Sequence, residues 1–285
     1  MGMKSEEESV ALQAIEFWTS VAEEETNLES DYLDAQDVSH AELVCLRSCA
    51  LNVTHQGLLD GDVEVPKYFA KIALPEVVPV LLQLLTRQDE DAEEGEWNVS
   101  MAAGTCLAFL AQAVHDPIVP AVIPFIEANI KQSDWHHREA AVMAFGSILV
   151  GPDPTVLTPL VNQALPILIG MMTDPQSQVK DTTAWTLGRI CESLITSIKP
   201  DVHLHALVTA LVAGLRDSPH IIANCCWALM NLADGLFELY ESSEEQNTGP
   251  LSPYFEGIVG ALLQVTETYV GQVTCKHPSV LTLSC

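Results

Sequence analysis

Arg138-Glu139-Ala140-Ala141-Val142 is a helical segment that recurs further along the chain as Lys180-Asp181-Thr182-Thr183-Ala184 and as Ile222-Ala223-Asn224-Cys225-Cys226. The three copies begin at 138, 180 and 222, so the repeat period is 42 residues. Less regular copies begin at residues 11 and 100: Ala11-Leu12-Gln13-Ala14-Ile15 and Ser100-Met101-Ala102-Ala103-Gly104. A period near forty residues that holds two helices is typical of HEAT and armadillo arrays. The sequence therefore predicts an all-α solenoid, a stack of antiparallel helix pairs.

We name the recurring helices the B helices. A second kind of helix, rich in Leu, Val and Pro, is expected between them and after the last one, and we name these the A helices. The expected A helices cover 75–87, 117–131, 154–173, 201–216 and 251–270. A capping residue followed by Pro at the first helical position supports this division into A and B helices, as in Asp116-Pro117, Asp153-Pro154, Asp174-Pro175 and Ser218-Pro219.

The array is expected to cover residues 1–270. Two segments interrupt the pattern: an insertion over 27–65, predicted as loop with at most one short helix, and an acidic loop over 88–97. Residues 271–285 form an atypical tail that lacks the expected B helix. The last A helix should therefore carry an apolar stripe without a partner.

The charge balance is strongly acidic, with 12 Lys and Arg against 39 Asp and Glu and a net charge of -27. Such a field disfavours nucleic acid and attracts basic protein segments. The polar start Met1 to Glu8 predicts no signal peptide, and no uncharged apolar run of 18 residues is evident, so no membrane span is expected. The 8 cysteines are then expected to be reduced thiols of an intracellular protein.

No catalytic motif is present: there is no glycine-rich phosphate loop, no Gly-x-Ser-x-Gly and no His-Glu-x-x-His. Cys45 and Cys49 lie near His40 and His55, but these spacings fit no established zinc pattern. The sequence therefore predicts neither an enzyme nor a metal or cofactor site.

A helical wheel gives each B helix one apolar face. One face is predicted to hold Val179, Thr183, Leu187, Ile190 and Leu194, and the next Ile222, Cys226, Leu229, Ala233 and Leu236. Trp185 and Trp227 occupy the same repeat position on the opposite, polar side, where Glu16 stands in the first B helix.

The stripe opposite the apolar faces is the predicted partner-binding surface. Besides these three residues it carries Glu23, Glu192, Asn224, Asn231 and Asp234. The alternative is that both tryptophans are core residues. Two tryptophans at one repeat position beside acids favour a surface for Lys and Arg side chains, through cation–π contact and charge pairing.

The acidic loop is the second candidate site. Its acids are Asp89, Glu90, Asp91, Glu93, Glu94 and Glu96, and Trp97 and the expected N-cap Asn98 follow directly. Most charge runs are solvated spacers. The tryptophan at the end of this run favours a part in binding.

Four stretches together resemble the central part of the importin-β (karyopherin) family of nuclear import receptors, with a lean towards fungal members. They are 10–18, the acidic run ending in Trp97-Asn98, 138–146 and 181–190. The resemblance covers roughly Val10 to Ala233 apart from the insertion. It implies a B-helix surface that binds the basic importin-β-binding helix of importin-α, or basic cargo directly, with Glu16, Glu23, Trp97, Trp185 and Trp227 as contact residues.

The resemblance further implies release by the GTP-bound form of Ran, contact with nucleoporins, and residence in cytoplasm and nucleus. The family has about twice as many repeats, so the main Ran site and the later repeats are expected to be missing from this truncated chain. The competing interpretation is a generic HEAT scaffold without a transport role, which would need neither an acidic loop nor repeated exposed tryptophans.

Overall fold

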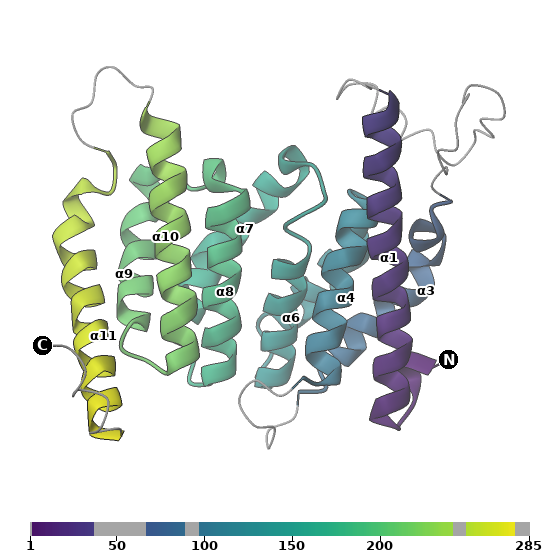
Figure 1. Cartoon of the computed structure of the whole chain (residues 1–285), viewed down its shortest axis with the longest axis horizontal. Helices are drawn as coiled ribbons and strands as arrows, with labels where there is room; N and C mark the ends of the chain where they lie inside the picture. The colour runs from purple at the N-terminus through teal and green to yellow at the C-terminus, as the bar shows by residue number, and fades with distance from the viewer. Residues whose placement is uncertain (1, 37–66, 89–96, 242–248, 277–285) are drawn as a thin grey trace, which may run out of the picture. The chain divides into compact units, whose positions relative to one another are not determined.

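The computed structural model describes residues 2–36, 67–88, 97–241 and 249–276. Every regular element in these ranges is a helix, which confirms the all-α prediction (Figure 1). The chain divides into two compact units: unit 1 comprises Met1–Pro124 with Val150–Pro152, and unit 2 comprises Phe125–Leu149 with Asp153–Cys285.

Unit 1 contains η1 (Gly2–Lys4), α1 (Glu8–Gln36), α3 (Phe69–Leu84) and α4 (Val99–Val114), and α5 (Ile118–Asn129) begins in it. The B helix α4 packs against the B helix α1 and against the A helix α3. Ile15, Leu81, Leu107 and Leu110 are fully buried between these helices. The predicted helix pair is therefore present.

Two boundaries in unit 1 differ from the sequence prediction, and the buried Glu25 on α1 explains the second of them. The helix α1 continues to Gln36, nine residues beyond the predicted start of the insertion at Asn27. The carboxylate of Glu25 accepts hydrogen bonds from the backbone N–H groups of Phe69 and of Ala70, the latter at 2.9 Å. Because α1 supplies this cap, α3 begins six residues before the predicted start at Pro75. The rest of the insertion lies outside the described residues.

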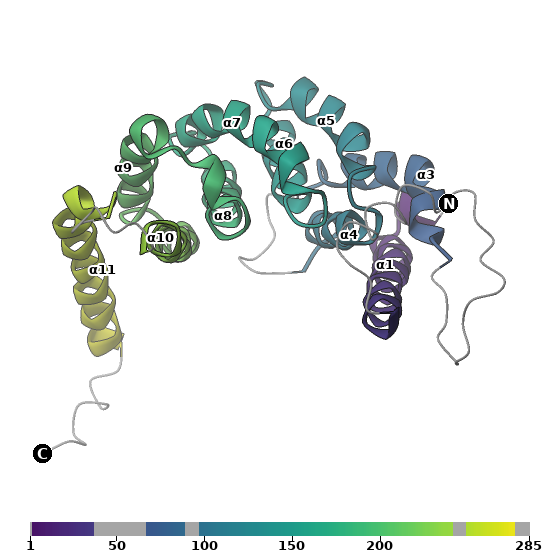
Figure 2. The ribbon, with the colours of Figure 1, turned by 90° about the horizontal axis from the view of Figure 1, so that it is seen from above.

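Unit 2 holds three B helices side by side: α6 (Trp135–Ser147), α8 (Ser177–Ser193) and α10 (Pro219–Glu241). The A helices α7 (Pro154–Met171) and α9 (His205–Gly214) form a second layer behind them (Figure 2). The short elements η2 (Ile195–Ser197) and η3 (Pro200–Leu204) precede α9, and η4 (Ser252–Tyr254) leads into α11 (Phe255–Lys276). Asp153 caps α7 as predicted, its carboxylate accepting from the N–H of Thr155 at 2.7 Å.

The repeats of unit 2 are joined by ion pairs in register. Arg138 donates from Nε and Nη2 to the two carboxylate oxygens of Asp174, at 2.9 Å each, and 42 residues later Lys180 pairs with Asp217. The predicted helix start at Asp174-Pro175 is wrong, because α8 begins at Ser177. Asp174 binds Arg138 of the preceding B helix instead of standing directly before α8. The carboxylate of Asp174 still accepts from the N–H of Gln176, at 2.9 Å.

The helix α7 corrects the statement that no uncharged 18-residue run exists. It contains 18 residues, none of them charged, and it is the one described helix long and apolar enough to cross a membrane. One side of it is buried in unit 2, through Leu157, Val161, Leu165 and Leu168. A core A helix of a repeat array satisfies the same criterion, so this composition needs no bilayer.

The buried face of α10 and the end of α11 also differ from the prediction. The most buried residues of α10 are Ile221, Cys225, Ala228 and Leu232, whereas Ile222 and Cys226 are only partly buried and Ala233 is exposed. The buried face is therefore rotated from the predicted one by about one residue. The helix α11 runs to Lys276 instead of ending at 270, and its Phe255, Val259 and Leu263 are exposed, in keeping with the expected stripe.

Candidate functional site

Trp185 and Trp227 each lie across a glycine of the preceding B helix. A Cβ atom added to Gly146 on α6 would overlap the six-membered ring of Trp185, and one added to Gly188 on α8 would overlap that of Trp227. Both indoles are partly buried. The tryptophans are therefore neither fully core nor fully surface residues. One face of each indole covers the neighbouring helix, and the rest of the side chain reaches the surface.

Of the predicted polar residues around them, two hydrogen-bond to the neighbouring helix and two are exposed. Asn224 donates to Asp181 at 2.9 Å and Asn231 donates to the carbonyl of Gly188 at 3.5 Å, so both amides also hold α10 against α8. Glu192 and Asp234 are exposed. We call the set on α8 and α10 the tryptophan surface: Trp185, Arg189, Glu192, Asn224, Trp227, Asn231 and Asp234.

Arg189 was not among the binding residues predicted from the sequence. Its Cζ atom lies 5.7 Å from the centroid of the Trp185 ring, and Nη1 lies 3.7 Å from the carboxylate of Glu192. Burial lowers the pKa of Arg189 from its ordinary value, and the charge of Glu192 opposes that shift. A guanidinium remains charged under such conditions, so the tryptophan surface contains one cation among its acids.

Three predicted contact residues belong to unit 1. Glu16 and Glu23 are exposed on α1, with the amide of Gln13 donating to Glu16 at 2.9 Å. Trp97 is 56% exposed directly before α4. Asn98 is confirmed as the N-cap, since its side chain accepts from the N–H of Met101 at 3.0 Å. The acidic residues 89–96 lie outside the described part of the chain.

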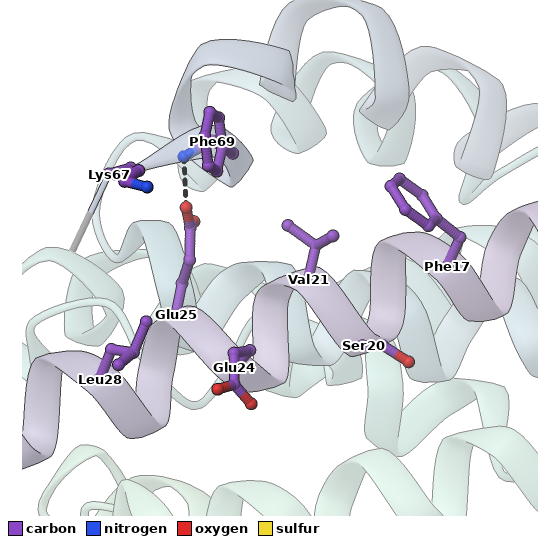
Figure 3. Close-up of a pocket in the computed structure, with 8 residues that line it drawn as sticks. All are labelled: Phe17, Ser20, Val21, Glu24, Glu25, Leu28, Lys67 and Phe69. Carbon is purple, nitrogen blue, oxygen red and sulfur yellow. Dashed lines mark hydrogen bonds between the residues drawn. The ribbon is translucent and has the colours of Figure 1, made fainter. Parts of the chain in front are cut away.

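Unit 1 also contains an apolar groove between α1 and the start of α3 that sequence reasoning missed (Figure 3). It encloses about 400 Å³ and is lined by Phe17, Ser20, Val21, Glu24, Glu25, Leu28, Lys67 and Phe69. The hydrogen bond from the Phe69 N–H to Glu25 joins the two sides of it (Figure 3). Phe17 and Phe69 are 61% and 54% exposed. The apolar spacing of Phe17, Val21 and Leu28 along α1 was the available sequence indication.

The described cysteines do not resemble nucleophiles. Burial raises the pKa of Cys106 to about 11 and that of Cys191 to about 12. Cys225 reaches about 12 as well, through burial and through the nearby Cys226 and acidic groups. Thiols with such pKa values stay protonated and unreactive at neutral pH. Among the residues that the structure describes, no group of three His, Cys, Asp or Glu could hold a metal ion.

Comparisons with known proteins agree on one family. Residues 135–190 match the HEAT-like repeat model, and residues 206–284 match the model of the TPR repeats of importin subunit beta-1-like proteins. The chain is 47% identical over 270 residues to importin subunit beta-1 of Schizosaccharomyces pombe and 42% identical over 272 residues to that of Arabidopsis thaliana. These matches cover 93% and 92% of this chain but 28% of each relative.

Solved structures give the same result. A crystal structure of importin beta in an ammonium sulfate condition matches with a TM-score of 0.79 and 44% identity, over 93% of this chain and 28% of the other. The Kap95:Nup1 complex matches with a TM-score of 0.76 and 38% identity, over 92% of this chain and 27% of the other. The chain thus spans a little over a quarter of the length of the proteins it matches.

Proposed function

Because the chain belongs to the importin-β family of nuclear import receptors, we propose that its tryptophan surface binds a Lys/Arg-rich helical segment of an adaptor such as importin-α or of a basic cargo. The main support is that two tryptophans, Trp185 and Trp227, recur at one repeat position on the helices that also carry the exposed carboxylates of Glu192 and Asp234. The partly exposed indole of Trp227 can accept a cation over its uncovered face while nearby carboxylates pair with that cation, whereas the ring of Trp185 already has Arg189 over it. The family is one of transport receptors and not of enzymes.

The long-range field supports the same proposal. The net charge of -27 attracts basic segments before contact, and the acidic run 89–96 adds six carboxylates next to Trp97. We infer that Glu16, Glu23 and Trp97 form a separate contact surface for basic segments on unit 1. The acidic run would then raise the association rate more than it lowers the dissociation rate.

Release and location follow as further parts of the proposal. Solved relatives include a complex of Kap95p with Ran and one of Kap95 with Nup1. We propose that a receptor built from such repeats gives up its basic load when GTP-bound Ran binds, contacts nucleoporins and works in both cytoplasm and nucleus.

Binding of a basic peptide is expected to depend steeply on salt. Raising the salt concentration from about 0.05 M to about 0.3 M should weaken the affinity for a Lys/Arg-rich helical peptide about tenfold or more, because screening shortens the reach of the acidic field. Isothermal titration with the full chain, and with a charge-neutral peptide of equal length as control, measures this. A constant affinity over that range would favour the scaffold interpretation.

The tryptophans should contribute to binding and, more weakly, to stability. Trp185→Ala and Trp227→Ala are each expected to lower the affinity for the basic peptide roughly tenfold, as substitutions of anchor residues do. Because each indole also covers a glycine of the neighbouring helix, each variant should unfold about 1 kcal/mol more easily. Trp135→Ala, at the start of α6 and outside the tryptophan surface, serves as the control. Unchanged peptide affinity in both variants would assign the indoles to packing alone.

A further inference from the structure

The tryptophan surface contains two subsites with the same layout, one period of 42 residues apart. The first subsite is Trp185, Arg189 and Glu192 on α8, and the second is Trp227, Asn231 and Asp234 on α10. In each of them the indole and an exposed carboxylate stand seven residues apart along the helix. The middle position differs, because the first subsite has a guanidinium there and the second has an uncharged amide.

In the first subsite, a cation of the chain itself occupies the place proposed for a cation of the ligand. The Cζ atom of Arg189 lies 5.7 Å from the centroid of the Trp185 ring, and its Nη1 atom lies 3.7 Å from the carboxylate of Glu192. These are the two contacts, cation–π and charge pairing, that a Lys or Arg of a bound segment makes with such a surface. Trp185 and Glu192 are therefore already paired in the unbound chain.

The second subsite is open to a cation. The amide of Asn231 donates to the carbonyl of Gly188 at 3.5 Å and carries no charge. Within the described part of the chain, no Lys or Arg lies over the ring of Trp227. Asp234 is exposed. A cation of the ligand can therefore bind here without displacing a charged group of the chain.

We propose that Arg189 is an internal competitor for the first subsite, which a cation of the bound segment displaces from Trp185 and Glu192. The inference rests on the proposed function of the tryptophan surface. The second subsite takes one cation of the segment directly. The first subsite adds affinity only when a further cation of the same segment replaces Arg189. The surface thereby discriminates against segments with a single cation and selects those with several.

The contacts of Arg189 are weak enough for this displacement. Its ion pair at 3.7 Å is longer than a hydrogen bond, and the carboxylate of Glu192 is 45% exposed, so water screens the pair. The Nε atom of Arg189 is buried and has no hydrogen-bond partner within the described residues, so outward movement lets water accept from it. Arg138 of the same unit is held differently, by four hydrogen bonds, and is not displaceable in this way.

Arg189→Asn tests the proposal by giving the first subsite the residue of the second. The full chain with this substitution should bind a Lys/Arg-rich helical peptide about fivefold tighter in isothermal titration, because no cation has to be displaced. Arg216→Asn removes the same charge from an exposed position after α9 and should change the affinity less than about twofold. The gain should also require the indole. In a Trp185→Ala background, Arg189→Asn should change the affinity less than about twofold.

The reverse substitution should close the second subsite. Asn231→Arg places a guanidinium four residues after Trp227, as in the first subsite, and should lower the peptide affinity about fivefold. Ala213→Arg adds the same charge at an exposed position of α9 and should lower it less than about twofold. Asn231→Gln, which changes the amide without adding charge, should leave the affinity near that of the unsubstituted chain.

The outcomes separate the inference from the proposed function, provided that thermal melts show the variants to be folded. If basic peptides bind but Arg189→Asn binds them no tighter than Arg216→Asn does, the inference is wrong and the proposed function stands. A gain that persists in the Trp185→Ala background would show that Arg189 acts through its charge alone, which also overturns the inference. If no basic peptide binds to any variant or to the unsubstituted chain, the proposed function fails and the inference fails with it.

Discussion

Replacing Arg138 with alanine is expected to lower the free energy of unfolding of unit 2 by about 3 kcal/mol. The guanidinium joins the loop before α6 to the loop before α8 through four hydrogen bonds, two to Asp174 and one each to Gln132 and Ser133. Asp174 is only 9% exposed beside Arg138, so its carboxylate would lose both of these hydrogen bonds and its nearest counter-charge, with Lys180 as the cation that remains. Urea denaturation, with hydrogen exchange of the α6 and α8 amides, measures the loss.

Lys180→Ala is the matched control, because Lys180 occupies the same repeat position one period later. Its partner Asp217 is 31% exposed, so water can replace more of the lost interaction and the loss should be under about 1 kcal/mol. Equal losses for the two variants would contradict the argument from burial.

The same ion pair predicts a pH dependence. Burial raises the pKa of Asp174, but the hydrogen bonds from Arg138 and from the Gln176 N–H, with the charges of Arg138 and Lys180, outweigh it and hold the pKa below its ordinary value. A carboxyl whose folded pKa is lowered stabilises the fold above its unfolded pKa, and this contribution is lost as the pH falls through the folded pKa. The wild-type chain should therefore lose stability below about pH 4, and Arg138→Ala should lose less over the same range. Parallel acid curves would exclude this ion pair as a cause.

The fold was predictable because the repeat is regular where it matters. The starts at 138, 180 and 222 predicted three B helices, and Asp153 before Pro154 located the start of the A helix α7 between the first two. The boundaries that failed depend on distant partners. Glu25 caps α3 from 44 residues away, and Asp174 accepts hydrogen bonds from Arg138 as well as from the backbone before α8. No local pattern contains these interactions.

The candidate site was predictable in its residues and not in its geometry. The wheel separated Trp185 and Trp227 from the apolar face, yet it was rotated on α10, where Ile221 and Cys225 are buried instead of Ile222 and Cys226. It also did not show that Trp227 lies on Gly188 of the preceding B helix.

Gly188→Ala is expected to destabilise unit 2 by about 2 kcal/mol and to displace the indole of Trp227. In an exposed helix interior the same change stabilises by up to about 1 kcal/mol, because alanine is the better helix former. Here the added methyl would occupy the space of the six-membered ring of Trp227, at its Cε3 and Cζ3 atoms. The ring must move outward or the helices must separate, and overpacking of this kind costs about 1–3 kcal/mol.

The expected readouts are a lower urea midpoint, a red-shifted tryptophan emission and weaker binding of the basic peptide, because Trp227 loses the surface that orients it. Gly260→Ala on α11 is the control, since a Cβ there meets nothing within 4 Å and the helix should gain a few tenths of a kcal/mol. If Gly188→Ala behaved like Gly260→Ala, with unchanged emission and binding, Trp227 would not depend on close contact with α8. The orientation of the tryptophan surface would then have to come from Asn224 and Asn231 alone, the two α10 side chains that hydrogen-bond to α8 beside it.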